Sequence, residues 1–218
     1  MRQRIWELDA LRGLCVIGMV LVHLALDLGL SPGFFQEWGG AGFLLISGIC
    51  VTLGRRHIRR GLLVLGCGML CTGVTALMYL LGMGDRNMII RFGILHCLGI
   101  CMLLWTLFSH LPQWGLGLLA PVLVFAGLWM DTVRVETPWL FPLGLRTVDF
   151  ASGDYFPLVL NLGFFLLGSL LGRRLYREKR SLLPNVKPLR FLCFCGRHSL
   201  LIYLLHQPVL IGTLMLFG

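Results

Sequence analysis

The stretch DALRGLCVIGMVLVHLALDLGL, residues 9–30, is an apolar run long enough to cross a bilayer, yet it contains ionisable side chains. A helix of about 20 apolar residues spans the hydrocarbon core of a membrane. Within the run His23 and Asp27 are one helical turn apart and therefore lie on the same helix face. Because ionisable groups are costly to bury in lipid, this pair predicts a functional site.

The composition of the whole chain is that of an integral membrane protein. Of the 218 residues, 57% are hydrophobic and 13% are charged, and the mean hydropathy is +0.83. A soluble domain carries nearer a quarter of charged residues. We therefore predict an all-α transmembrane bundle in which residues 1–218 form one domain. The predicted spans are residues 9–30, 37–54, 61–82, 88–108, 114–131, 155–172 and 191–217.

The basic residues predict the orientation of this bundle. Seven crossings place 15 of the 19 Lys and Arg residues on one side of the membrane. Positively charged loops stay in the cytoplasm, so the N-terminus should be cytoplasmic and the C-terminus outside. The net charge of +9 then reflects orientation, with anionic membrane lipids as partners, and does not indicate nucleic acid. The cytoplasmic set is Arg2, Arg4, Arg12, Arg55, Arg56, Arg59, Arg60, Arg173, Arg174, Arg177, Lys179, Arg180, Lys187, Arg190 and Arg197.

The eight cysteines give little reason to expect a metal site. Cys67 and Cys71, and likewise Cys97 and Cys101, are four residues apart, but no zinc-type pattern of histidines or carboxylates surrounds them. In apolar spans a cysteine packs as a small hydrophobic side chain. We expect these cysteines to pack and no metal to be bound.

Polar residues of four predicted helices fall at similar depths, between the midplane and the outer face. A rise of about 1.5 Å per residue puts His23 and His96 at this depth. His206 lies in the outer half of the last span, and Asp154 stands at the outer start of the sixth. We expect His23, Asp27 and His96 to be catalytic. We expect Arg91, Asp154, His206 and Gln207 to bind a substrate from outside.

The pair His23–Asp27 carries the strongest chemical signal. A carboxylate at i+4 can accept the imidazole proton, which fixes the tautomer and leaves the other ring nitrogen free as a base. The alternative is that the histidines only join neighbouring helices through hydrogen bonds worth about 1 kcal/mol. For His206 both interpretations have equal support, because Pro208 frees backbone groups that could bond the ring.

Further charged residues lie at the cytoplasmic ends of the first and last spans. Asp9 and Arg12 are three residues apart and can form an ion pair, and Arg197 and His198 open the last helix. With the basic stretch RRHIRR, residues 55–60, these positions could bind an anionic ligand from the cytoplasm. The alternative is a structural salt bridge at the membrane surface.

Five motifs follow one another along nearly the full chain: RIWELDALRGLCVIGMVLVHLALDL, FLLISGICVTLGRR, IIRFGILHCLGICMLL, DYFPLVLNLGFFLLGSLLGR and GRHSLLIYLLHQPVL. In this order they resemble the bacterial members of the heparan-α-glucosaminide N-acetyltransferase catalytic-domain family, which belongs to a class of transmembrane acyltransferases that modify glycans. The resemblance implies a location in the bacterial cytoplasmic membrane.

The resemblance also implies transfer of an acetyl group from cytoplasmic acetyl-CoA to the amine or hydroxyl of a sugar across the membrane. A histidine is expected to act as general base or as transient acyl carrier. On this hypothesis Asp27 orients His23, and His96 or Arg91 stabilises the oxyanion. Asp154 and the outer loop hold the glycan or amino-sugar acceptor. The phosphates of acetyl-CoA dock near Arg12, Arg197 and the stretch RRHIRR. The expected donor-binding set is Asp9, Arg12, Arg197 and His198.

Two other classes of protein stay open. In a small proton-coupled transporter the same histidines would form a proton relay, although the chain shows no inverted repeat. In a non-catalytic membrane partner they would only join helices. A bundle of this size is also compatible with a homodimer, for which the sequence indicates no interface.

Overall fold

The computed structural model describes residues 5–30, 33–184 and 189–217. In these ranges the regular structure is helical, with two isolated β-bridges and no strand. The all-α class is therefore confirmed. Arg2, Arg4 and Lys187, on which the orientation prediction draws, lie outside the described residues. The helices are α1 Trp6–Asp27, α2 Phe34–Leu53, α3 His57–Leu80, α4 Ile94–Phe108, α5 Gln113–Thr132, α6 Leu158–Leu175, α7 Arg190–Arg197 and α8 Ser199–Phe217, with the 3₁₀ turns η1 Arg86–Met88 and η2 Pro138–Leu140.

Each predicted span contains a helix, and most ends agree to within four residues, but two spans differ from the prediction by more. The fourth helix begins at Ile94 instead of residue 88, because residues 89–92 form extended backbone that bonds to a second loop. The last apolar run is divided at His198 into α7 and α8. The break lets α7 pack across α1 while α8 continues along the bundle.

Four of the described helices, α1, α3, α5 and α6, are long and apolar enough to cross a membrane. Shorter apolar stretches lie in α2, α4 and α8. The 15 residues of α4 extend about 22 Å, which is less than the hydrocarbon thickness of about 30 Å. The chain is thus an integral membrane protein, while seven complete crossings and the side of each end stay predictions.

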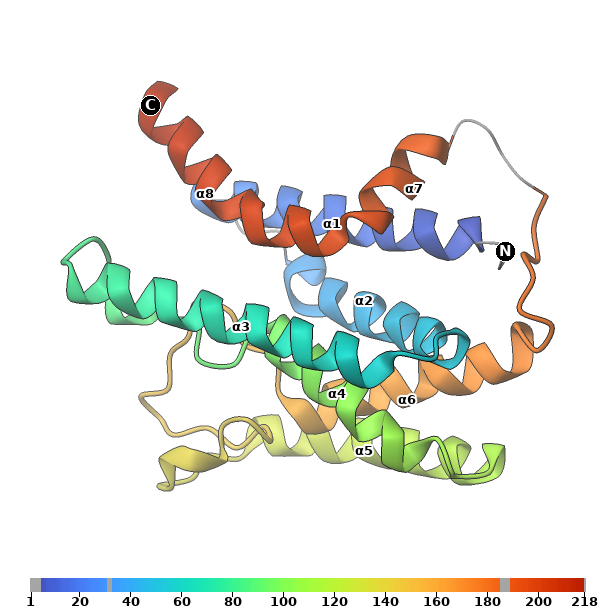
Figure 1. The fold of residues 1–218 in the computed structure, drawn as a ribbon. Helices are drawn as coiled ribbons and strands as arrows, with labels where there is room; N and C mark the ends of the chain where they lie inside the picture. Colours follow the sequence, from blue (N-terminus) through green and yellow to red (C-terminus); the bar gives the residue numbers. More distant parts are fainter. Residues whose placement is uncertain (1–4, 31–32, 185–188, 218) are drawn as a thin grey trace.

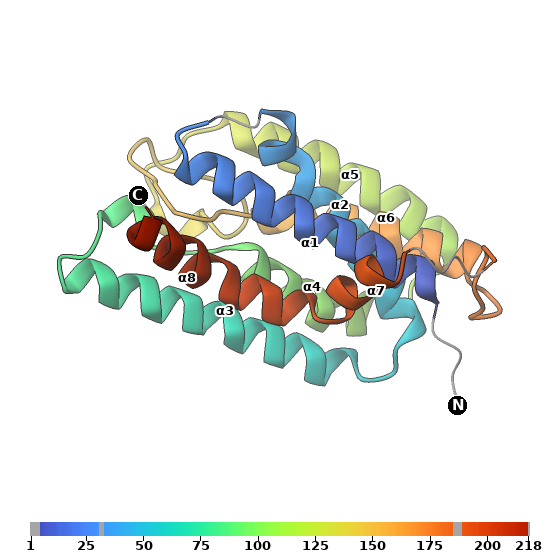
Figure 2. The same cartoon turned by 90° about the horizontal axis from the view of Figure 1, so that it is seen from above.

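The helices α1, α2, α3, α5 and α6 run roughly along one direction, as Figures 1 and 2 show. In Figure 1, α1, α7 and α8 lie on one side of the bundle and α5 on the opposite side, with α2, α3, α4 and α6 between them. In both views α1 begins at one end of the bundle and α8 finishes at the other.

Glycines allow the closest helix contacts. Gly48 and Gly168 lie where α2 meets α6, and a Cβ on either one would overlap a backbone carbonyl of the facing helix. Gly13 and Gly196 have the same arrangement where α1 meets α7. Small residues at such crossings let backbones approach, and helices in lipid associate through this close packing. These contacts hold α1, α2, α6 and α7 in the positions that frame the site.

Candidate functional site

A cavity of about 1460 Å³ lies between the helices α1, α2, α3, α4, α6 and α8. On α1 its lining extends from Arg12 to Leu26, a length of about 21 Å at 1.5 Å per residue. Between its ends the lining includes apolar side chains such as Met19, Phe43 and Leu98. Polar residues gather at its two ends. The cavity thus extends along most of the length of α1.

The first polar end is basic, and we call it the cationic end. Its lining includes two of the predicted donor-binding residues, Arg12 and Arg197. Arg12 donates a hydrogen bond to Ser199 Oγ (3.3 Å), and its buried Nε has no partner in the described part of the chain. Guanidinium groups around one opening suit a ligand that carries phosphates. The cationic end consists of Arg12, Arg56, His57, Arg60 and Arg197.

The other two predicted donor-binding residues lie beside the cationic end. Asp9 is on α1 where α7 crosses it, with its backbone carbonyl against Gly196. His198 is exposed between α7 and α8, and its ring centroid is 4.5 Å from that of Phe194. The structure therefore places Arg12 and Arg197 on the cavity and puts Asp9 and His198 next to it.

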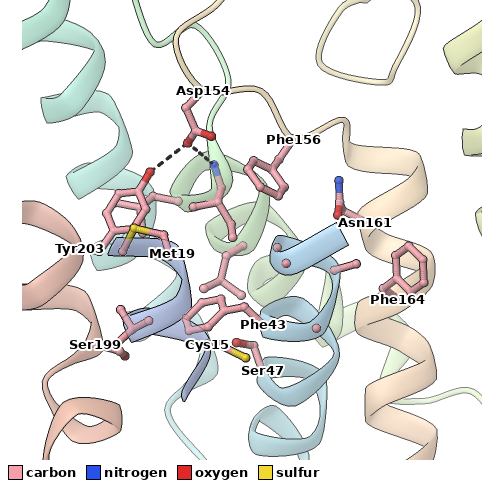
Figure 3. A pocket seen from close by; sticks show the side chains of 18 of the residues that line it. Cys15, Met19, Phe43, Ser47, Asp154, Phe156, Asn161, Phe164, Ser199 and Tyr203 are labelled. Carbon is pink, nitrogen blue, oxygen red and sulfur yellow. Dashed lines mark hydrogen bonds between the residues drawn. The ribbon is translucent and has the colours of Figure 1, made fainter. Parts of the chain in front are cut away.

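The opposite polar end, which we call the distal end, is built around a carboxylate. Asp154 Oδ2 accepts hydrogen bonds from the backbone N–H of Ile94 (3.0 Å) and from the hydroxyl of Tyr203 (2.9 Å), as Figure 3 shows. Burial raises the pKa of Asp154, and the two hydrogen bonds act against this rise. The N-terminus of α4 also favours a carboxylate through the helix dipole. The distal end consists of His23, Asp131, Arg146, Asp154, Tyr155 and Tyr203.

Two loops that are hydrogen-bonded to each other, residues 89–93 and 152–156, hold Asp154 at the distal end. The backbone N–H of Phe156 donates to Phe92 O (2.9 Å), and that of Gly153 donates to Ile89 O (3.2 Å). Non-helical backbone at membrane depth needs such partners, since lipid supplies none. Gly93 completes the arrangement, because a Cβ at this position would overlap the carboxylate of Asp154.

A contact within α1 fixes the orientation of the His23 ring at the distal end. Its Nδ1 lies 2.9 Å from the carbonyl oxygen of Met19. Because a carbonyl only accepts, Nδ1 carries a hydrogen, and in the neutral ring Nε2 is the nitrogen with the free lone pair. Asp27 is exposed, and within the described residues no hydrogen bond joins it to His23. The carbonyl oxygen of Met19, one turn before His23, thus accepts the hydrogen bond that the sequence suggested for Asp27.

His206 lies against His23, with ring centroids 4.8 Å apart and an edge-to-face arrangement. Its Nδ1 lies 2.6 Å from the carbonyl oxygen of Tyr203, so this ring also carries its hydrogen on Nδ1. Its Nε2 is buried without a partner in the described ranges, as is Oε1 of Gln207. Two imidazoles whose Nδ1 atoms donate to backbone carbonyls therefore meet edge to face near Asp154.

His96 and Arg91 support the site from outside the cavity lining. The backbone N–H of Gly93 donates to His96 Nδ1 (3.2 Å), and His96 Nε2 lies 3.2 Å from Thr72 Oγ1. Both ring nitrogens of His96 thus have hydrogen-bond partners beside the start of α4. Neither nitrogen is free to act as a base in the cavity. The guanidinium of Arg91 lies over the ring of Phe150, 5.5 Å from its centroid.

The described residues hold no group of three or more His, Cys, Asp or Glu side chains that could bind a metal. The eight cysteines are free thiols, and Cys97 and Cys101 are completely buried between helices. Packing accounts for their positions.

Comparison with known protein families identifies the chain at the level of its family. The family described as "Heparan-alpha-glucosaminide N-acetyltransferase, catalytic" matches residues 4–208. The chain belongs to this family. No curated protein and no solved structure matches it.

The matched range of the heparan-alpha-glucosaminide N-acetyltransferase family covers α1 to α7 and the first half of α8. It therefore includes all residues of the cationic end and of the distal end. The resemblance in the five motifs is confirmed, while a bacterial source stays a prediction.

Sequence reasoning missed Tyr203 and the pair Asp131–Arg146. A tyrosine in an apolar helix is typical of the lipid interface, so Tyr203 gave no separate signal. The sequence held one indication of Tyr203. A buried carboxylate such as Asp154 needs hydrogen-bond donors, and Tyr203 carries a hydroxyl one turn before His206, at the same depth.

Proposed function

We propose that the protein transfers an acetyl group from acetyl-CoA at the cationic end to the amine or hydroxyl of a sugar at the distal end. The observation that carries this proposal is that one and the same cavity has the arginines at one end and His23 and Asp154 near the other. A donor with phosphates at one end and a thioester at the other requires such a route. Membership of an acetyltransferase family supports it.

The donor would be held by charge and by apolar contact. Arg12, Arg56, Arg60 and Arg197 supply hydrogen-bond donors for phosphates, and Arg12 has a buried Nε still without a partner. The middle of the cavity, with Phe43 and neighbouring apolar side chains, suits the long arm that carries the thioester.

The chemistry would take place at His23. Its Nε2 accepts the proton of the attacking amine or hydroxyl while the new bond forms to the acetyl carbon. The C–S bond then breaks, and the proton passes to the departing sulfur, which leaves as a thiol. General base catalysis of this kind contributes about 10²–10⁴-fold. The same nitrogen would carry the acetyl group if the transfer runs in two steps. Asp154 and Tyr203 would orient the acceptor.

Release of free thiol from acetyl-CoA is the direct test of this function. The purified full chain in detergent, supplied with acetyl-CoA and an amino sugar, should release thiol in proportion to protein and produce an acetylated sugar. A sample that releases no thiol with any sugar acceptor would contradict the proposed function.

Replacing Arg12 by glutamine should raise the KM for acetyl-CoA by about tenfold at low salt and change kcat little. The reason is the loss of one charge-assisted contact to the donor, which added salt would also weaken. Steady-state kinetics over a range of acetyl-CoA concentrations measures this. Arg174→Gln, an exposed position outside the cavity lining, is the matched control. An unchanged KM in Arg12→Gln would remove Arg12 from the donor site.

The contact between His23 and His206 favours a second candidate, a proton-coupled transporter. Two neighbouring imidazoles in a membrane can pass a proton between them. Such a protein would acidify vesicles when its solute is supplied and would leave acetyl-CoA intact. The thiol assay therefore separates the two functions.

A further inference from the structure

A second, smaller cleft of about 290 Å³ lies where the ends of α2, α5 and α6 meet. It shares no lining residue with the large cavity. Three of its described lining residues, Arg173, Arg177 and Lys179, are basic, and none of them is acidic. The cleft is therefore a separate basic site on the same chain.

The cleft lies at the level where helices leave the hydrocarbon core of the membrane. Two candidate membrane spans meet there, since α5 begins at Gln113 and α6 finishes at Leu175. Figures 1 and 2 show these helix ends at the end of the bundle where α1 begins. Trp114, beside Gln113, is 71% exposed, and tryptophan is typical of the boundary between lipid and water. A ligand in the cleft would thus lie at the depth of the lipid headgroups.

The positive charge of the cleft is not matched by a carboxylate. Arg173 Nη1 and Nη2 donate to the carbonyl oxygens of Leu111 and Ser109 (2.6 Å each), and its guanidinium lies 5.0 Å from the ring centroid of Trp105. These neutral groups fix the guanidinium and leave its charge in place. Within the described residues, no ion pair joins Arg173, Arg177 or Lys179 to an acidic side chain.

A turn after α6 brings Lys179 back to the cleft. Its backbone is in the left-handed region (φ 55°), and its N–H donates to the carbonyl oxygen of Tyr176 (3.0 Å). The acidic residues near this turn lie outside the lining. Glu178 is 3.9 Å from Arg180, and Glu7 is buried on α1. Arg177 and Lys179 are therefore available to an anion.

We propose that this cleft binds the phosphate of an anionic phospholipid from the adjoining leaflet. Arg177 and Lys179 donate charge-assisted hydrogen bonds to the phosphate oxygens, and the fixed charge of Arg173 adds to the attraction. Basic pockets between transmembrane helices recognise acidic headgroups in this way. The acyl chains lie along the outer faces of α5 and α6, where Trp114 and Leu175 are exposed. The inference does not depend on acetyl transfer.

Lipid binding to the purified full chain in detergent tests the proposal. Native mass spectrometry measures the Kd for phosphatidylglycerol and for phosphatidylcholine with the same acyl chains. We expect phosphatidylglycerol to bind about tenfold more tightly. Arg177→Gln combined with Lys179→Gln should weaken its binding by about tenfold and leave phosphatidylcholine unaffected. Arg174→Gln combined with Arg180→Gln removes the same charge from exposed positions outside the lining, and should leave both Kd values unchanged.

All four substituted side chains are exposed, so both double variants should unfold at the temperature of the parent in lipid-free detergent. Equal Kd values for the two lipids would overturn the proposal. An equal loss in the two double variants would also overturn it, because only the overall charge would then matter. Glycerol 3-phosphate carries the same phosphate without acyl chains. If it bound as tightly as phosphatidylglycerol, the ligand would be a soluble phosphate and the assignment to a lipid would be wrong.

Discussion

Replacing His23 by alanine should lower the rate of acetyl transfer by about 10²–10⁴-fold, the usual contribution of a positioned base. In the structure the carbonyl of Met19 fixes the hydrogen on Nδ1, and the ring lies between the cavity and His206. The variant loses the only atom of this side chain that can accept the proton. The initial rate of thiol release at saturating acetyl-CoA and glucosamine measures the loss.

Two further measurements separate a chemical role of His23 from a structural one. Added imidazole should restore part of the activity of His23→Ala, because the removed ring leaves a space beside His206. His110→Ala, at an exposed position, should keep the full rate and serves as the matched control. Near-normal activity of His23→Ala without imidazole would show that another group is the base.

Replacing Gly168 by alanine should destabilise the protein severely, by about 3 kcal/mol or more. The added Cβ would overlap the backbone carbonyl of Leu45 on α2. A backbone cannot swing aside as a long side chain can, so α2 and α6 would have to separate. Loss of this contact would also widen the cavity. Thermal unfolding of the purified variant in detergent, together with its yield of monodisperse protein, measures the effect.

Gly66→Ala is the control for this substitution. Gly66 lies in α3, and a Cβ there would meet nothing within 4 Å. Alanine is a better helix former than glycine by about 1 kcal/mol, so this variant should be as stable as the parent or slightly more stable. If Gly168→Ala unfolded at the same temperature as Gly66→Ala, the close packing of α2 on α6 would be refuted.

The positions of the helices follow from the sequence because lipid requires long apolar runs with satisfied backbone groups. The break at His198 does not, since the apolar run 191–217 continues through it. The break depends on α7 packing against α1 through Gly196, and a single run cannot reveal a contact between distant segments. The late start of α4 has the same origin, because it depends on pairing between residues 89–92 and the loop before α6.

The depth argument places His23, Asp154 and His206 at one level, and the structure brings them to one region. Their catalytic and binding roles stay predictions. The depth argument does not predict the hydrogen-bond partners of these residues, because a hydrogen bond forms or is lost when the distance between donor and acceptor changes by a few tenths of an ångström. Helix spacing suggests Asp27 for His23, but the nearer acceptor is a backbone carbonyl. His96 has the expected depth, yet its ring faces Gly93 and Thr72, away from the cavity.

Transfer across a sealed membrane tests the central claim most directly. Vesicles with the protein inserted in one orientation would receive acetyl-CoA on the side of the cationic end and enclose glucosamine on the other side. A cavity that joins both ends predicts N-acetylglucosamine on the acceptor side and free thiol on the donor side. Product that forms only when both substrates share one side would contradict it.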